Sequence, residues 1–420
     1  MSEGGRETGV AEHLFRHEAG RITAALVRVL GLHNLDLAEE VTQDTLLRAL
    51  EVWQLGVPDD PAGWLIRVAR NRAIDVIRRE RAFRRFAPDL TRLLESEWML
   101  APTVDDAFFA HEIRDAQLCV MFCCAHPSLP PPAQVAVMLK TLCGFSVGEI
   151  AHAFLVPETT IEKRLSRAYA ELRTHRNFLD AVTGPHVPER LASVHASLYL
   201  LFNEGYHGSH PEHAVREELC GEAMRLCALL AEHPAGDVPR THALFALFCF
   251  HAVRLGTRTD ASGALQLLAE QDRSRWDRAL IARGEASLSR ASTGNELSAY
   301  HVEAAIAACH ATAASFADTD WRSIVNLYDV LLRIRPSAVV ALNRAIAVGY
   351  ADGPAFGLDA IDALARETSL AAYPFLDAAR GDFLRALGRT AEAHASFERA
   401  IARARNDAER ELLARKLRGG

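Results

Sequence analysis

The stretch "GFSVGEIAHAFLVPETTIEKRLSRAYAEL" (144–172) predicts two helices joined by a short turn. The first opens with Ser146 and places Glu149 three residues later, the pattern of a capping box at a helix start. Pro157 presets φ for the second helix, and the hydroxyls of the threonines that follow are able to cap its first N–H groups. A short helix, a turn and a longer helix predict a helix-turn-helix.

The second helix separates apolar from polar side chains. At about 100° per residue, one arc holds residues that we expect to be buried: Ile161, Leu165, Ala168 and Leu172. The opposite arc holds candidate DNA-reading residues: Thr159, Thr160, Lys163, Ser166 and Arg167. A recognition helix presents such a face to the major groove of DNA. The alternative is a helical hairpin inside a bundle, because the turn lacks the glycine often found there.

A basic helix is predicted about 80 residues earlier. The stretch "WLIRVARNRAIDVIRRERAFRR" (64–85) carries eight arginines against two acidic residues. One arc of about 100° holds a stripe of polar residues: Arg67, Arg70, Asn71, Arg78, Arg81 and Arg85. A guanidinium stripe on a helix that docks through its apolar side suits DNA phosphates. A solvated basic face, or a site for an acidic protein, is the alternative.

The residues before the basic helix are acidic. Seven acidic residues face a single arginine between Asp36 and Asp60. In a helix over 37–53, one face holds Glu40, Asp44, Arg48 and Glu51, with Gln43 at its margin. This face is suited to a basic partner protein, or is a plain solvated surface. Because charge is segregated in this way, the net charge of −7 does not exclude binding to nucleic acid.

The whole sequence predicts an all-α protein with several domains. Helical periodicity continues through nearly all 420 residues, and no stretch alternates convincingly as a β-strand does. We divide the chain into a helical domain at 10–86, a proline-containing acidic linker at 87–111, a second helical domain at 112–180 and a C-terminal extension at 188–420.

The extension contains a weak repeat. Small and large residues follow the spacing of a tetratricopeptide helix pair: Gly381, Ala393, Phe397 and Ala400. Tyr328 precedes Phe397 by 397 − 328 = 69 residues, about two repeats, and Pro336 ends its helix. We therefore expect a tetratricopeptide-like helical solenoid, an architecture that usually binds partners.

Three motifs in this order resemble the extracytoplasmic-function (ECF) sigma factors of bacterial RNA polymerase. "LDLAEEVTQDTLLRALEVW" (35–53) resembles the region 2 helix that docks on the polymerase, and "PAGWLIRVARNRAIDVIRRE" (61–80) the helix that engages the −10 promoter element. "PPPAQVAVMLKTLCGFSVGEIAHAFLVPETTIEKRLSRAYAELR" (130–173) resembles region 4, which reads the −35 element. "SVHASLYLLFNEGYHGSHPEH" (193–213), followed by repeats, is similar to the subgroup with a long tetratricopeptide-like extension.

The resemblance implies a sigma factor with no cofactor and no catalytic residues. It implies that the acidic face binds core RNA polymerase, that the arginine stripe and Trp64 bind the −10 element, including its melted strand, and that the recognition helix binds double-stranded DNA at the −35 element. It also implies that the extension modulates activity through an intramolecular contact with the sigma domains. A ligand-sensing helix-turn-helix regulator that does not join the polymerase is the alternative.

The segment "FNEGYHGSHPEH" (202–213) contains three histidines at intervals of three residues. Such spacing suits a metal site on a helix, but Gly205, Gly208 and Pro211 interrupt helices. We expect a turn between solenoid helices. Its residues Asn203, Glu204 and Tyr206 either fix the geometry of the turn or contact the sigma domains. A metal site, or an enzyme housed in the extension, is the alternative reading.

Cysteine usage and hydropathy predict a cytoplasmic protein. None of the eight cysteines forms a CxxC pair, and Cys119, Cys123 and Cys124 lie in an apolar helical context, so we expect buried reduced thiols. The sequence has no apolar run of about 18 to 20 residues and no basic-then-apolar leader, so we expect no membrane association.

Overall fold

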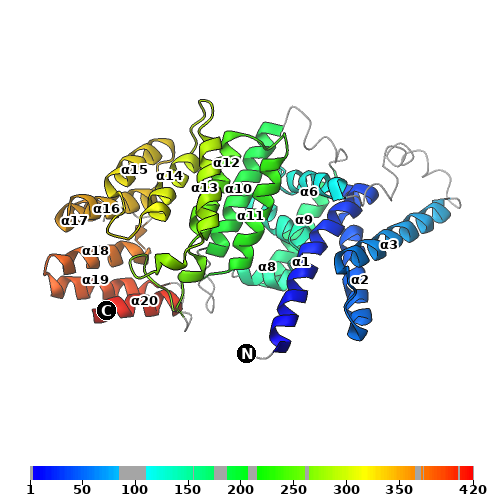
Figure 1. Ribbon diagram of the computed structural model, residues 1–420, viewed down its shortest axis with the longest axis horizontal. Helices are drawn as coiled ribbons and strands as arrows, with labels where there is room; N and C mark the ends of the chain where they lie inside the picture. Colours follow the sequence, from blue (N-terminus) through cyan, green and yellow to red (C-terminus); the bar gives the residue numbers. More distant parts are fainter. Residues whose placement is uncertain are drawn as a thin grey trace. The chain divides into compact units, whose positions relative to one another are not determined.

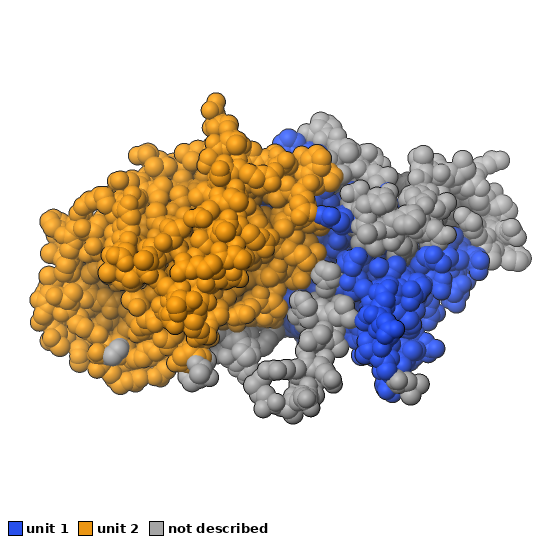
Figure 2. All heavy atoms as spheres, in the orientation of Figure 1, with its two compact units in different colours: residues 1–200 blue, residues 201–420 orange. Residues whose placement is uncertain are grey.

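The computed structural model describes residues 3–84, 110–154, 156–174, 187–206, 215–260, 264–364, 370–371, 373–404 and 407–419. Within these ranges the chain is built from helices, and its one strand-like pairing is an isolated bridge between Thr259 and Leu265. The all-α prediction is therefore confirmed. The chain divides into two compact units, residues 1–200 and 201–420 (Figure 2), and the division falls inside helix α10 (Val187–Tyr206).

Unit 1 begins with three helices, α1 (Glu3–Leu30), α2 (Leu35–Val52) and α3 (Pro61–Arg84), and the last two correspond to the helices predicted at 37–53 and 64–85. Gly31, at φ 85°, ends α1 in a conformation that favours glycine and leads into a 3-10 turn before α2. The three helices pack against one another and bury apolar side chains of each, such as Leu26, Leu35 and Leu65.

The helix-turn-helix is formed by α8 (Val147–Ala153) and α9 (Glu158–Leu172), which follow α6 (Ala110–Cys124) and α7 (Pro131–Leu142). The capping box is confirmed, since Ser146 N donates to Glu149 Oε2 (2.8 Å) and Glu149 N donates to Ser146 Oγ (3.1 Å). The predicted hydroxyl cap of α9 is wrong. Pro157 is the N-cap residue and no side chain caps it, so both threonines lie within the first turn.

The N-terminal helices and the helix-turn-helix pack together within unit 1. A Cβ added to Gly20 of α1 would lie only 1.9 Å from the carbonyl oxygen of Leu142 at the end of α7. The two backbones therefore approach more closely than any side chain at this position would allow. α1 also packs along α6, and the thiols Cys119, Cys123 and Cys124 of α6 are buried, as predicted.

Unit 2 begins with the last turn of α10 and continues with α11 (Glu217–Glu232), α12 (Pro239–Ala252), α13 (Arg278–Ala291) and α14 (Ala299–Thr312). α15 (Trp321–Ile334), α16 (Ala338–Asp352), α17 (Pro354–Ala363), α18 (Pro374–Ala386), α19 (Thr390–Ala402) and α20 (Asp407–Arg418) complete it. Each helix from α14 to α20 packs on the next, in the manner of a solenoid (Figure 1).

The repeat residues pack as their spacing predicts. Ala393, Phe397 and Ala400 are fully buried, and a Cβ added to Gly381 would lie 2.8 Å from the Phe397 ring. A glycine on α18 therefore lets the large residue of α19 approach its backbone. α15 ends at Ile334, two residues before Pro336, as expected.

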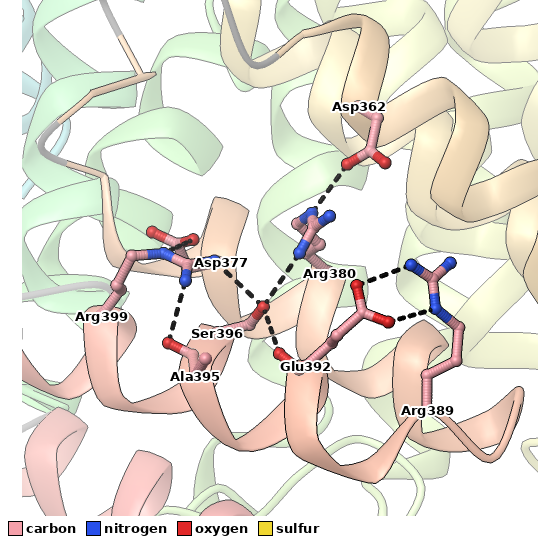
Figure 3. Close-up of polar contacts among 8 residues, drawn as sticks. All are labelled: Asp362, Asp377, Arg380, Arg389, Glu392, Ala395, Ser396 and Arg399. Carbon is pink, nitrogen blue, oxygen red and sulfur yellow. Dashed lines mark hydrogen bonds and ion pairs between the residues drawn. The ribbon is translucent and has the colours of Figure 1, made fainter.

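Ion pairs involving arginine connect the last repeats (Figure 3). Arg380 donates to Asp362 at 2.7 Å, and Arg399 donates to the buried Asp377 at 2.9 Å. The hydroxyl of Ser396 accepts from both arginines, at 3.3 and 3.0 Å. Charged side chains at these helix contacts thus meet both a carboxylate and a neutral acceptor.

The predicted turn residues Asn203, Glu204 and Tyr206 lie in the last turns of α10, so the expectation that Gly205 interrupts the helix is wrong. A Cβ on Gly205 would lie 2.7 Å from the carbonyl oxygen of Arg216, which shows why glycine is needed: the segment before α11 passes close by. The three histidines of the metal alternative lie in 207–214, outside the described residues.

No helix among the described residues is long and apolar enough to cross a membrane.

Candidate nucleic-acid and polymerase interface

Helix α9 has one buried face and one exposed face, as predicted for a recognition helix. Ile161, Leu165, Ala168 and Leu172 are all at most 5% exposed. The exposed face carries Thr159, Lys163, Ser166 and Arg167, while Thr160 is half-buried. Two cations and two hydroxyls are thus available for phosphates and base edges, on a helix held rigidly by its apolar side.

Helix α3 exposes three of the four stripe residues whose side chains the structure describes. Arg67, Asn71 and Arg78 are exposed, whereas Arg70 is half-buried. The side chain of Arg81, and all of Arg85, lie outside what the structure describes. The two arginines that the stripe omits, Arg72 and Arg79, are also exposed, but to one side of it.

Trp64 takes part in an aromatic cluster at the start of α3. Its ring lies edge-on to that of Trp53, with centroids 5.5 Å apart, and Trp53 in turn lies 5.2 Å from Phe15. Trp64 is half-buried in this arrangement. The cluster fixes the loop between α2 and α3 against α1, so Trp64 has a packing role whatever else it contacts.

The predicted partner-binding face of α2 is exposed along its length: Glu40, Gln43, Asp44, Arg48 and Glu51 all face solvent. Arg48 and Glu51 form an exposed ion pair at 2.9 Å. Two leucines on the same helix are exposed as well, Leu47 by 58% and Leu50 by 53%. At about 100° per residue, Leu47 lies within the polar face, between Gln43 and Glu40. Large apolar residues ringed by charges are typical of a protein-docking surface.

Glu39 on α2 is a residue that the sequence did not single out, and it binds the helix-turn-helix. Its Oε1 accepts hydrogen bonds from Thr141 Oγ1 of α7 (2.9 Å) and from the hydroxyl of Tyr169 of α9 (2.7 Å). Burial raises the pKa of the Glu39 carboxyl, although both hydrogen bonds and Lys140 act in the opposite direction. Burial and the adjacent carboxyl raise the pKa of Tyr169 well above its usual range.

A second contact between these parts of unit 1 is exposed. Arg173, just after α9, forms an ion pair with Asp36 of α2, and both side chains are about half exposed. Solvent screens such a pair, so it contributes little to stability compared with the half-buried Glu39 contact.

The first part of the extension also contacts the helix-turn-helix domain within unit 1. Ser197 of α10 donates to Gln134 Oε1 of α7 at 3.0 Å, and both side chains are buried. Gln134 Nε2 in turn donates to the carbonyl of Leu129 at 2.9 Å, which fixes the amide so that its oxygen faces α10. A fully satisfied buried network of this kind specifies how two helices pack.

Models of three known protein families match three segments of the chain. Residues 14–83 match sigma-70 region 2 and residues 122–172 match sigma-70 region 4. Residues 190–292 match a family of unknown function, DUF6596. No solved structure matches the chain.

Two relatives are similar to this chain in sequence, and one of them is a sigma factor by name. An uncharacterized protein of Rhizobium meliloti (strain 1021) is 40% identical over 379 residues, which cover 90% of this chain and 88% of the relative. The ECF RNA polymerase sigma factor SigE of Mycolicibacterium smegmatis is 29% identical over 164 residues, 39% of this chain and 60% of the relative. The chain belongs to the ECF branch of the sigma-70 family, whose members are transcription initiation factors that bind core RNA polymerase and promoter DNA, and it carries a helical C-terminal extension.

Proposed function

We propose that this sigma factor, acting in the cytoplasm without a cofactor, reads the −35 element with α9 and the −10 element with α3, while α2 docks on core RNA polymerase. The observation that carries the proposal is the separation of faces on α9. Its buried side is entirely apolar, and its exposed side offers Lys163, Ser166 and Arg167. On the family's region 4, that side faces the DNA.

The basic surface of α3 supports the −10 assignment. Arg67, Arg78 and Asn71 project away from the apolar side that packs on α1 and α2. Among the α3 side chains that the structure describes, only Trp64 is aromatic, and it already packs on Trp53. Since aromatic stacking would stabilise melted strands of any sequence, a surface with so little of it should depend strictly on matched −10 and −35 sequences.

The exposed face of α2 supports the polymerase assignment. Leu47 and Leu50 supply apolar area, and the acidic residues around them complement a basic partner. A regulator that binds only DNA has no use for such a face.

Reading both elements at once requires the two sigma regions to separate. The elements are 35 − 10 = 25 positions apart, about 85 Å at the 3.4 Å rise of DNA. Glu39 of region 2 instead lies within hydrogen-bond distance of Thr141 and Tyr169 of region 4. We take this closed arrangement to be the form of the free protein, which opens on the polymerase.

The extension is proposed to modulate this opening. The hydrogen bond from Ser197 to Gln134 supports the proposal, because it joins the first extension helix to α7, the helix that also carries Thr141. A movement of α10 would therefore displace α7, whose Thr141 donates a hydrogen bond to Glu39.

The −35 assignment is tested with Lys163→Ala and Arg167→Ala in promoter binding by the reconstituted holoenzyme. Each change should weaken binding to an intact promoter by about 1–3 kcal/mol if the side chain reads a base, and less on a promoter with a scrambled −35 element. Equal losses on both templates would show that α9 does not read that element. On the −10 side, Arg78→Ala should weaken binding and its off-stripe neighbour Arg79→Ala should not.

A further inference from the structure

Three arginines gather beyond the C-terminal end of α12 in unit 2. Arg254 and Arg258 flank a 3-10 turn (Leu255–Thr257), and their guanidinium carbons lie 5.5 and 3.9 Å from the centre of the Tyr206 ring. Arg273 lies with its guanidinium 4.6 Å from the ring centre of Trp276. Two aromatic rings thus hold the cationic groups in fixed positions.

Two of these guanidinium groups are incompletely hydrogen-bonded. Arg273 is only 9% exposed, and its Nη1 donates to the carbonyls of His310 (2.7 Å) and Ala313 (2.8 Å). Among the described residues, its Nη2 has no hydrogen-bond partner and is buried, as are Nη1 of Arg258 and Nδ1 of His310. Buried charged donors that lack an acceptor are strongly unfavourable.

The rest of unit 2 shows how its arginines are usually satisfied. Those of the last repeats meet carboxylates (Figure 3). Three others that also bury an unpartnered nitrogen each form an ion pair with a glutamate: Arg216, Arg240 and Arg415. In the described part of unit 2, no carboxylate forms an ion pair with Arg254, Arg258 or Arg273. The carboxylate of Asp318 raises the pKa of Arg273, but it is exposed and accepts a hydrogen bond from Ser315 Oγ at 2.7 Å.

The cationic groups also act on one another. Burial lowers the pKa of Arg258 and of Arg273, and Arg254 adds to the lowering in both, while Tyr206 acts on Arg258 and Asp318 acts on Arg273 in the opposite direction. Burial, with Arg254 and Arg273, lowers the pKa of His310 to about 4, so this imidazole is neutral near pH 7. The carbonyls at the helix ends offset only part of the positive charge, because they carry partial charges.

We propose that Arg254, Arg258 and Arg273 bind an oxyanion group of a small ligand, a carboxylate or a phosphate. The planar guanidinium fork matches two oxygens of either group. The unpartnered nitrogens of Arg258 and Arg273 supply donors, and His310 supplies a neutral one in its appropriate tautomer. Such a site gives the extension a chemical input that is independent of how the sigma regions read DNA.

The test is isothermal titration calorimetry of the full chain with inorganic phosphate and, separately, succinate, at constant ionic strength in chloride. We expect one bound molecule per chain for at least one of the two, and the anion that binds identifies the ligand group. Arg254→Gln and Arg258→Gln should each weaken binding at least ten-fold. Arg283→Gln is the matched control, because Arg283 also lies over a ring, that of Phe245 at 5.2 Å, but is exposed; it should bind as the unmodified chain does.

Thermal melting shows that the variants are folded and gives a second readout. At a ten-fold excess over Kd, the ligand should raise the melting temperature of the extension by about 3 to 6 °C. Without ligand, Arg254→Gln should melt no lower than the unmodified chain, because it relieves repulsion. Absence of binding by both anions, or equal binding by all variants, would overturn the proposal.

Discussion

Replacing Glu39 should loosen the contact between region 2 and region 4 in proportion to the hydrogen bonds removed. Glu39 accepts from Thr141 at 2.9 Å and from Tyr169 at 2.7 Å. A hydrogen bond to a charged acceptor contributes about 1.5–3 kcal/mol, partly offset by the hydration that the buried carboxylate loses. We therefore expect Glu39→Ala to destabilise the contact by about 2–4 kcal/mol. Tyr169→Phe, which removes one bond, should cost about 1–2 kcal/mol.

Glu39→Gln separates the hydrogen bonds from the charge. Burial raises the pKa of Glu39 above its usual value of 4.5, so the folded chain binds this proton more readily than the unfolded chain. The stability linked to this group is complete below the unfolded pKa and is lost as pH rises through the folded pKa. Glutamine keeps an acceptor oxygen and carries no charge, so Glu39→Gln should abolish this pH dependence and be at least as stable as the unmodified chain at neutral pH.

Hydrogen–deuterium exchange of α7 and α9 in the full chain, corrected for intrinsic rates between pH 4 and 8, measures the contact directly. Asp36→Asn is the matched control, because Asp36 lies on the same helix as Glu39 and its carboxyl forms the exposed ion pair with Arg173. Its effect should stay below about 1 kcal/mol. The reasoning is refuted if Asp36→Asn opens the contact as much as Glu39→Ala, or if Glu39→Gln keeps the original pH dependence.

Three further outcomes are expected. Leu47→Ala should weaken binding to core RNA polymerase by about 1–2 kcal/mol without loss of stability. Leu297 is 60% exposed in the extension, and Leu297→Ala should leave polymerase binding unchanged. Equal binding by both variants would show that Leu47 is not part of the docking surface. In chemical denaturation, Asp377→Asn should lower the free energy of unfolding of the extension by about 1–3 kcal/mol, because the buried carboxylate binds Arg399 and Arg403. The control is Asp362→Asn at a half-exposed carboxylate, which should change the free energy of unfolding by less than about 1 kcal/mol. Truncation at Val187 should change the amount of transcript but not the promoter elements used, and an unchanged amount would contradict a regulatory extension.

The sequence was sufficient for features that depend on local periodicity. The buried face of α9 follows from the spacing of Ile161, Leu165, Ala168 and Leu172, and the capping box from Ser146 and Glu149 three residues apart. Both are fixed within one helix. The repeat residues Gly381 and Phe397 were predictable for the same reason, because adjacent helices of one hairpin pack at a regular spacing.

Features that depend on distant segments were not predictable. Glu39 looks like any other acidic residue of α2, and its role appears only when Thr141 and Tyr169, over 100 residues away, come into contact with it. Leu47 was not singled out, because periodicity does not reveal which apolar positions of a helix remain exposed. Gly205 was read as a helix breaker, whereas the approach of the segment before α11 explains it. The arginines of the proposed oxyanion site are spread over 20 residues in separate turns.

The most direct test of the central claim is transcription by core RNA polymerase from genomic DNA, with and without the purified chain, followed by mapping of RNA 5′ ends. We expect the chain to produce discrete start sites that share two sequence elements, about 10 and 35 base pairs upstream. Start sites no different from those of core polymerase alone would contradict the assignment of this chain as an initiation factor.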